Sequence, residues 1–259
     1  MADLFVSLVA ITKSSQQTAL QSGLRTAGIA PATSQTFPAG RRTTHSVLST
    51  SSLANGLISF YNLNGNANDS VGANNGTISN ISWASSFNGA PCATSTSNLA
   101  YIDLGTAPTL NLMVLSISIW VLVPTTGSYT PLVCRTQGSG ATASTYELRL
   151  DQFNNVQWYA RGGLGLWTGP ALSTGSWHHV VAIRDNSGIH SAYIDGAATS
   201  TAGPFFDSLP SNHTYIAYRE DALAHQLASY AQVGIWNRVL TPLEISELYN
   251  SGYGNPYPF

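Results

Sequence analysis

Four residues in the middle of the chain combine aromatic rings with a cation. Trp158, Tyr159 and Arg161 lie in one short segment, and Trp167 follows in a glycine-flanked stretch that predicts a loop over residues 162–169. An aromatic face can stack on the apolar face of a pyranose, while guanidinium and amide groups bond its hydroxyls. The four are therefore candidate ligand-binding residues for a glycan. The alternative for each ring is packing in a protein core.

Two carboxylates are spaced so that they share one face of a strand. Glu147 and Asp151 lie four residues apart, with Arg149 as the other charge nearby. Glycoside hydrolysis needs a pair of carboxylates placed for acid/base work. An arginine beside this pair does not complete such a site, and no nucleophile elbow, phosphate loop or metalloprotease motif is present. We therefore predict no catalytic residues and expect that the chain is not an enzyme.

The histidines show no spacing that suits a metal ion. His178 and His179 are adjacent in a predicted strand, so they point to opposite faces and cannot chelate one ion together. His213 and His225 lie in a loop-rich stretch without the spacing of zinc ligands. We expect no zinc site, and a structural role for the adjacent pair.

The composition excludes several classes of partner. Charged residues make up 8% of the 259 residues and the net charge is −2, whereas an average soluble domain has about 25% charged residues. Without a basic surface nothing holds a nucleic acid backbone, and no apolar run is long enough to cross a bilayer. We expect no nucleic acid partner and no membrane insertion. Cys92 and Cys134 are expected as two buried thiols, with a single bridge as the alternative.

The stretch from Trp177 to Gly196 predicts the hairpin around which the fold is organised. A run rich in β-branched residues comes first, and Asp185–Gly188 is a cluster of turn-forming residues. The chain then returns as a strand to Ile194, and Asp195 with Gly196 forms a second tight turn. Strands of this kind predict a sandwich over about residues 53–240.

The C-terminal part predicts one short helix, over residues 242–250. Thr241 is a good N-cap, Pro242 suits the first helical position, and Glu244 places an acid in the first turn. We expect Glu244 and Glu247 to lie in solvent, and the apolar face to dock on the sandwich through Leu243, Ile245, Leu248 and Tyr249. The aromatic, proline-rich end NPYPF is expected to pack rather than to extend into solvent.

Residues 1–52 have a pattern of their own. Leu4–Ile11 predicts a strand, a helix capped by Ser14 or Ser15 runs to Gly28, and a stretch rich in Pro, Ser and Thr continues to residue 52. We predict a small N-terminal docking arm and linker at 1–52, followed by a sandwich domain at 53–259. The arm is expected to attach the sandwich to other proteins of an assembly, and a poorly ordered tail is the alternative.

Four segments, in order, resemble the laminin-G-like domains of the concanavalin A-like lectin/glucanase superfamily. They are Leu57–Thr77 (LISFYNLNGNANDSVGANNGT), Leu115–Pro124 (LSISIWVLVP), the W-H-H-V and Y-I-D-G hairpin at 177–196, and Val233–Gly252 (VGIWNRVLTPLEISELYNSG). The resemblance implies an all-β fold, an antiparallel two-sheet β-sandwich of the jelly-roll type. It implies less about function, because this fold is found in lectins, enzymes and adhesion modules.

The resemblance also raises the question of calcium. In related domains the residue equivalent to Asp69 often helps to bind calcium, which takes about six to eight oxygen ligands. Closing strands of such domains commonly carry G-x-I-D-E-V, where residues 228–233 here read ASYAQV, so both acidic positions are absent. The E-x-D-x-x-E motif of the superfamily's glucanases is absent too. Asp69 is a candidate calcium ligand, with closure of an Asx-turn as the alternative.

These observations predict a non-catalytic structural or binding protein. The resemblance to modules of phage components, together with the charge-poor composition, suggests a virion surface, fibre or capsid decoration protein. We expect its sandwich to bind host or environmental glycans and the chain to form a homo-oligomer. The alternatives are a purely structural cement protein without a ligand, and a soluble cellular lectin or adhesin with an extracellular location.

Overall fold

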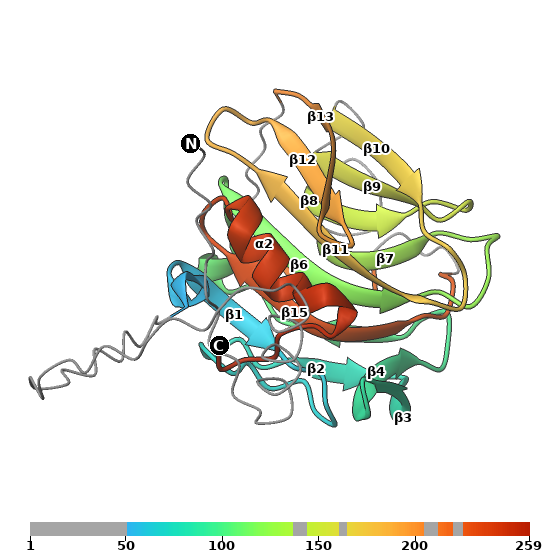
Figure 1. The fold of residues 1–259 in the computed structure, drawn as a ribbon. Coiled ribbons are helices and arrows are strands. Elements are labelled where there is room, and N and C mark those ends of the chain that lie inside the picture. Colours follow the sequence, from blue (N-terminus) through green and yellow to red (C-terminus); the bar gives the residue numbers. More distant parts are fainter. Residues whose placement is uncertain (1–50, 137–143, 161–164, 205–211, 220–224) are drawn as a thin grey trace, which may run out of the picture. The chain divides into compact units, whose positions relative to one another are not determined.

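The computed structural model describes residues 51–136, 144–160, 165–204, 212–219 and 225–259. The strand and helix predicted within residues 4–28, and nearly all of the docking arm predicted at 1–52, lie outside these residues. The described residues form two antiparallel sheets (Figure 1). No helix among them is long and apolar enough to cross a membrane.

The two sheets interleave segments from the whole described chain. The eight-stranded sheet has the order β13 (Ala197–Ala202), β12 (His190–Ile194), β11 (Trp177–Arg184), β6 (Leu115–Leu122), β15 (Ser229–Trp236), β4 (Ala90–Ser95) and β3 (Ile81–Phe87), with β1 (Leu57–Tyr61) paired to β15. The seven-stranded sheet has the order β10 (Gly165–Ala171), β9 (Asn155–Ala160), β8 (Ser144–Leu150), β7 (Thr130–Thr136), β14 (His213–Ile216), β5 (Tyr101–Asp103) and β2 (Thr77–Ser79). Short 3₁₀ turns lie at Ser52–Ala54, Pro108–Leu110 and Asn250–Gly252.

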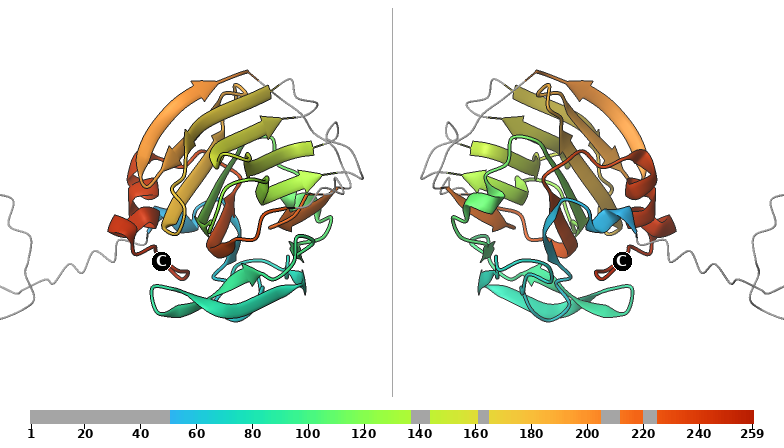
Figure 2. Two further views of the ribbon diagram at one scale, coloured as in Figure 1. Left: turned by 90° about the vertical axis from the view of Figure 1, so that its right-hand side faces the viewer. Right: turned by 90° about the vertical axis from the view of Figure 1, so that its left-hand side faces the viewer.

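The main core lies between the two sheets, which face each other in Figure 2. It follows the period-two alternation of the strands, since Ile117, Ile119 and Val121 of β6 pack in the same cluster as Leu148 and Leu150 of β8. The predicted all-β, two-sheet antiparallel sandwich with a short C-terminal helix is confirmed.

The predicted central hairpin is present as β11 and β12. Asp185 organises the first turn, because its Oδ1 accepts hydrogen bonds from the backbone N–H groups of Ser187 at 2.8 Å and Ile189 at 2.9 Å. In the second turn Asp195 has φ 51° and Gly196 has φ 78°, the left-handed values that a tight two-residue hairpin turn requires.

A second apolar layer covers the outer face of the eight-stranded sheet. Helix α2 (Pro242–Tyr249) lies across this face in Figure 1, where Ile245 and Leu248 pack in one buried cluster with Trp236 of β15. Trp120 of β6 stacks on Tyr249 at a centroid distance of 5.8 Å. The central strand β6 is consequently buried on both faces rather than on one.

The C-terminal segment completes this layer, as its aromatic composition predicted. The ring of Phe259 meets Phe60 of β1 edge-on at 5.3 Å, and Tyr257 lies 6.1 Å from the same ring. Asn62 fixes the segment, because its side-chain amide accepts from the N–H of Tyr257 and donates to the carbonyl of Tyr257, both at 3.1 Å.

The helix begins as predicted but is rotated about its axis. Thr241 and Glu244 form a reciprocal capping box. Glu244, expected in solvent, is buried, and Leu243, expected to dock, is 79% exposed. Tertiary contacts explain the difference. Arg238 donates to the Glu244 carboxylate at 2.6 and 2.9 Å, and the Ser52 hydroxyl donates to the same carboxylate at 2.7 Å. This ion pair draws the first turn of the helix inward on its acidic side.

The burial of Glu244 predicts a pH-dependent contribution to stability. The hydrogen bonds from Arg238 lower the pKa of Glu244 from 4.5 to about 2. Hydrogen bonds with Thr241 and Ser52 act in the same direction, whereas partial burial alone would raise this pKa. Because the folded-state pKa lies below the ordinary value, the stabilisation is present above pH 4.5 and is lost as the pH falls toward 2. We expect Glu244→Gln to lower the free energy of unfolding at pH 7 by up to about 3 kcal/mol.

Urea unfolding at pH 7, 5 and 3 measures this, and the difference between wild type and Glu244→Gln should shrink as the pH falls. Glu247→Gln on the same helix is the control, because Glu247 makes no side-chain hydrogen bond or ion pair with the described residues. A constant difference at all three pH values would contradict the linkage.

Candidate functional site

The structure buries both tryptophans that were candidates for sugar contact. Trp158 in β9 is fully buried and its indole N–H donates to the carbonyl of Ile183 at 3.2 Å. Trp167 is 2% exposed and donates to the Ser200 hydroxyl at 3.1 Å. Neither ring offers a face to a ligand in this structure, so both are core residues.

The loop predicted over residues 162–169 is wrong from Gly165 onward. Those residues start β10, in which Trp167 lies opposite Trp158 of β9. The glycine that suggested a loop has another purpose, since a Cβ at Gly169 would lie 2.1 Å from the Trp167 ring. Gly169 therefore makes room for the indole to fold over the strand.

The structure describes the other two candidates, Tyr159 and Arg161, only in part. Tyr159 lies in β9 opposite Glu147 of β8, but its side chain is outside the described set, and Arg161 lies outside the described residues altogether. A contact of Tyr159 or Arg161 with a glycan stays a prediction.

Asp69 organises the loop that follows β1. Its Oδ1 accepts from the backbone N–H groups of Phe60 at 3.1 Å and Val71 at 3.0 Å, and its Oδ2 accepts from Asn74 N–H at 3.1 Å. Three N–H groups aimed at the carboxylate favour the Asx-turn alternative, because a cation would have to displace them. Among the described residues no group of three or more His, Cys, Asp or Glu side chains is placed to hold a metal.

The carboxylates Glu147 and Asp151 are committed to different partners. Glu147 Oε1 is bonded by Arg149 and by Arg219, each at 2.7 Å. Arg149 also lies over the ring of Tyr129 at 4.7 Å. Asp151 instead holds the β8–β9 turn, where its Oδ1 accepts from two backbone N–H groups. The two acids serve separate structural networks.

The adjacent histidines point to opposite faces, as predicted. His178 is bonded through Nδ1 to Asp195 and through Nε2 to Ser173, both at 2.8 Å. This is the order of groups in a serine nucleophile, its base and an orienting carboxylate. Acyl transfer also needs N–H groups that stabilise an oxyanion, and the nearby Gly175 N–H is already bonded to Val123.

The electrostatics around these histidines favour structural roles. Burial alone would raise the pKa of Asp195, but the hydrogen bonds from His178 and from the His179 backbone lower this pKa. Burial lowers the pKa of His179 to about 3, so its ring is neutral where it stacks on Trp120. The bonds of His178 join the loop before β11 to the β12–β13 turn.

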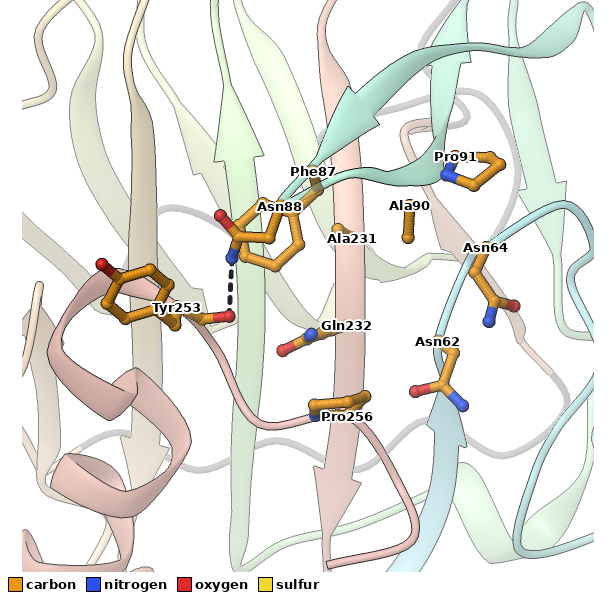
Figure 3. Close-up of a pocket in the computed structure, with 10 residues that line it drawn as sticks. All are labelled: Asn62, Asn64, Phe87, Asn88, Ala90, Pro91, Ala231, Gln232, Tyr253 and Pro256. Atoms are coloured by element: carbon orange, nitrogen blue, oxygen red, sulfur yellow. Dashed lines mark hydrogen bonds between the residues drawn. The ribbon is translucent and has the colours of Figure 1, made fainter. Parts of the chain in front are cut away.

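A cavity of about 210 Å³ opens on the outer face of the eight-stranded sheet, beside the end of β1. We call it the amide cavity. It is lined by Asn62, Asn64, Phe87, Asn88, Ala90, Pro91, Ala231, Gln232, Tyr253 and Pro256 (Figure 3). Four of these side chains are amides, and none is an acid, a lysine, an arginine or a histidine. The site is therefore polar but uncharged.

A β-bulge in β15 places two neighbouring residues in the amide cavity. Tyr230, Val233 and Ile235 all pack between the sheets, so the inward spacing is three residues and then two. The pairing with β6 shifts between Ala231 and Gly234, and Gln232 has φ 46°. Ala231 and Gln232 therefore both face outward, which uninterrupted alternation forbids.

The C-terminal segment forms one wall of the amide cavity and is held from two sides. Asn88, in the β3–β4 turn, donates to the carbonyl of Tyr253 at 2.6 Å, drawn as the dashed line in Figure 3. Asn62 holds Tyr257 as described above. Gly254 allows a close approach, since a Cβ there would lie 2.4 Å from Gln232 Oε1.

Two amides of the cavity have no partner among the described residues. The side chains of Gln232 and Asn64 make no hydrogen bond with the described part of the protein, and each offers an acceptor and two donors. Prolines 91 and 256 and the Phe87 edge supply apolar surface. Sequence reasoning missed this site, although the irregular apolar spacing at Tyr230, Val233 and Ile235 was visible.

Comparisons with known proteins identify the fold. Residues 95–246, more than half of the chain, match the sequence profile of the Concanavalin A-like lectin/glucanases superfamily. Trypanosoma rangeli sialidase in complex with sialic acid superposes with a TM-score of 0.60 at 17% identity, over 76% of this chain and 33% of that one. The binding domain of Paraclostridial Mosquitocidal Protein 1 superposes with a TM-score of 0.60 at 16% identity, over 77% and 53%. No curated protein matches.

These comparisons contradict the expectation that the chain is not an enzyme, because proteins that share its fold include sialidases. At these identities the likeness establishes the fold alone. The chain spans 33% of the length of the sialidase, so the activity of the whole sialidase does not pass to it.

The burial of Trp167 predicts a cost in stability. We expect Trp167→Ala to lower the free energy of unfolding by about 3–5 kcal/mol, because it leaves a cavity between the sheets. Phe153→Ala is the matched control: its ring is 64% exposed, so a change within about 0.5 kcal/mol is expected. Equal melting temperatures for the two variants would show that Trp167 is not a core residue.

Proposed function

Because the chain belongs to the Concanavalin A-like lectin/glucanases superfamily, we propose that its sandwich is a carbohydrate-binding module that uses the amide cavity. One observation carries the proposal: an uncharged cavity that presents unpaired amides beside apolar surface. Hydroxyl groups both donate and accept hydrogen bonds, and a side-chain amide does the same, so the two pair reciprocally. Prolines and the Phe87 edge contact the C–H face of a sugar ring.

The size of the amide cavity limits what it encloses. At about 210 Å³ it is smaller than the roughly 300–1,000 Å³ of pockets that enclose drug-sized ligands. It therefore takes one sugar unit, and the remainder of a longer glycan stays in solvent. The wall formed by the C-terminal segment is fixed by Asn62 and Asn88 before a ligand binds, which reduces the ordering cost of binding.

We also propose that this module belongs to an assembly such as a virion surface, to which residues 1–52 attach it. Support comes from the sequence: the low content of charged residues and the separate pattern of the first 52 residues. A homo-oligomer on such a surface would gain avidity from several weak sugar sites.

Substitution of the two unpaired amides tests the proposed function. Asn64→Ala and Gln232→Leu should each weaken glycan binding by about 3- to 10-fold, since each removes hydrogen bonds worth roughly 0.5–1.5 kcal/mol. A glycan array identifies the ligand and isothermal titration calorimetry measures the affinities. Gln152→Ala is the control, because Gln152 is exposed and lies outside the amide cavity.

The melting temperatures of all three variants should match that of the wild type. Undiminished binding by both cavity variants would place the sugar site elsewhere on the sandwich.

A further inference from the structure

The charge of the amide cavity bears on which class of sugar it suits. Among its ten lining residues the Tyr253 hydroxyl is the sole titratable group, and no cationic side chain is present. A carboxylate that leaves water pays a large desolvation cost unless a cation or several donors replace the water. Sugars that carry a carboxylate, such as sialic acids and uronic acids, would enter this cavity without that compensation.

The donors that the cavity offers are uncharged. The amide groups of Asn62 and Asn88 are directed to the carbonyls of Tyr257 and Tyr253. Gln232 and Asn64 keep all of their amide N–H groups for a ligand, and every donor of the cavity lining is neutral. Two neutral amides match hydroxyls better than a carboxylate, because hydroxyls also donate to the amide oxygen, whereas a carboxylate only accepts.

The arginines of the described residues are committed to structural partners elsewhere. Arg149 and Arg219 bond Glu147, and Arg238 bonds Glu244. Arg184 donates to three backbone carbonyls. Arg135 donates to Thr214. None of these side chains lines the amide cavity, so none can pair with an acidic sugar there.

We propose that the amide cavity selects an uncharged sugar unit and that Gln232 is its specificity-determining residue, an inference that rests on the proposed function. The bulge in β15 presents Gln232 outward, and its amide lies beside Gly254 of the C-terminal segment. Ala231 and Gln232 are both uncharged. The neutral pair leaves the floor of the cavity without charge.

A charge can be introduced at position 232 by substitutions that change the shape of the side chain little. Gln232→Glu keeps the length of the side chain but replaces the amide donor with a charged acceptor. Gln232→Lys lengthens the side chain by one methylene and adds a cation that can pair with the carboxylate of an acidic sugar. Because Gln232 points away from the core between the sheets, neither change buries a charge in that core.

The test uses the full chain and isothermal titration calorimetry with defined probes. The neutral probes are methyl glycosides of hexoses and N-acetylhexosamines, and the charged probes are N-acetylneuraminic acid and glucuronic acid. We expect the wild type to bind at least one neutral probe at least tenfold more tightly than either charged probe. Gln232→Glu should lose at least fivefold in affinity for that neutral probe at pH 7 and recover part of it at pH 4.5, where the carboxyl regains a proton.

Gln232→Lys gives the opposite readout, since it should bind the charged probes at least fivefold more tightly than the wild type does. Gln152→Glu is the control for net charge and should leave every affinity unchanged. Wild-type protein that prefers the charged probes would overturn the inference while leaving sugar binding in place. Wild-type protein that binds neither class would overturn the proposed function and the inference together.

Discussion

The constraint on which the rest of the structure depends is that the eight-stranded sheet is buried on both faces. An antiparallel sheet commonly leaves one face to water, but here large rings such as Trp120 and Trp236 lie on the outer face and need a cover. Helix α2 and the C-terminal segment provide it, held by the Arg238–Glu244 ion pair and by Asn62. The amide cavity lies beside that segment, against the β3–β4 turn.

The strands and turns were readable from the sequence because their signals are local. Period-two alternation, the turn-forming residues around Asp185 and the capping sequence at Thr241 each depend on residues within a few positions. The rotation of α2 was not readable. An amphipathic pattern favours Leu243 toward the core, whereas the Arg238–Glu244 pair and the Ser52 hydroxyl turn the acidic side inward. The orientation of α2 is therefore set partly by a contact between residues far apart in the chain, Ser52 and Glu244.

The candidate site was harder to predict than the fold, for two physical reasons. The glycines around Trp167 indicate flexibility in a sequence, but Gly169 gives space to an indole inside a strand. The amide cavity joins the end of β1, the β3–β4 turn, a bulge in β15 and the C-terminal segment, so no window of sequence contains it. The sequence does show the irregular spacing of Tyr230, Val233 and Ile235. A bulge produces this spacing because it adds one residue between two side chains that point inward.

The bulge in β15 has an evolutionary consequence. Ala231 and Gln232 contribute no side chain to the packing between the sheets, while their neighbours Tyr230 and Val233 do. Positions that pack between the sheets and positions that line the amide cavity are therefore neighbours along one strand without sharing packing partners between the sheets. Gln232 is outside every buried cluster, so substitutions at 232 change the lining of the amide cavity. Selection for folding acts on Tyr230 and Val233 between the sheets and on Ala231, which packs against Phe87 and Trp120 on the outer face. A lineage of such domains can change the cavity lining at this one position on an unchanged framework, and a laboratory library restricted to codon 232 would do the same.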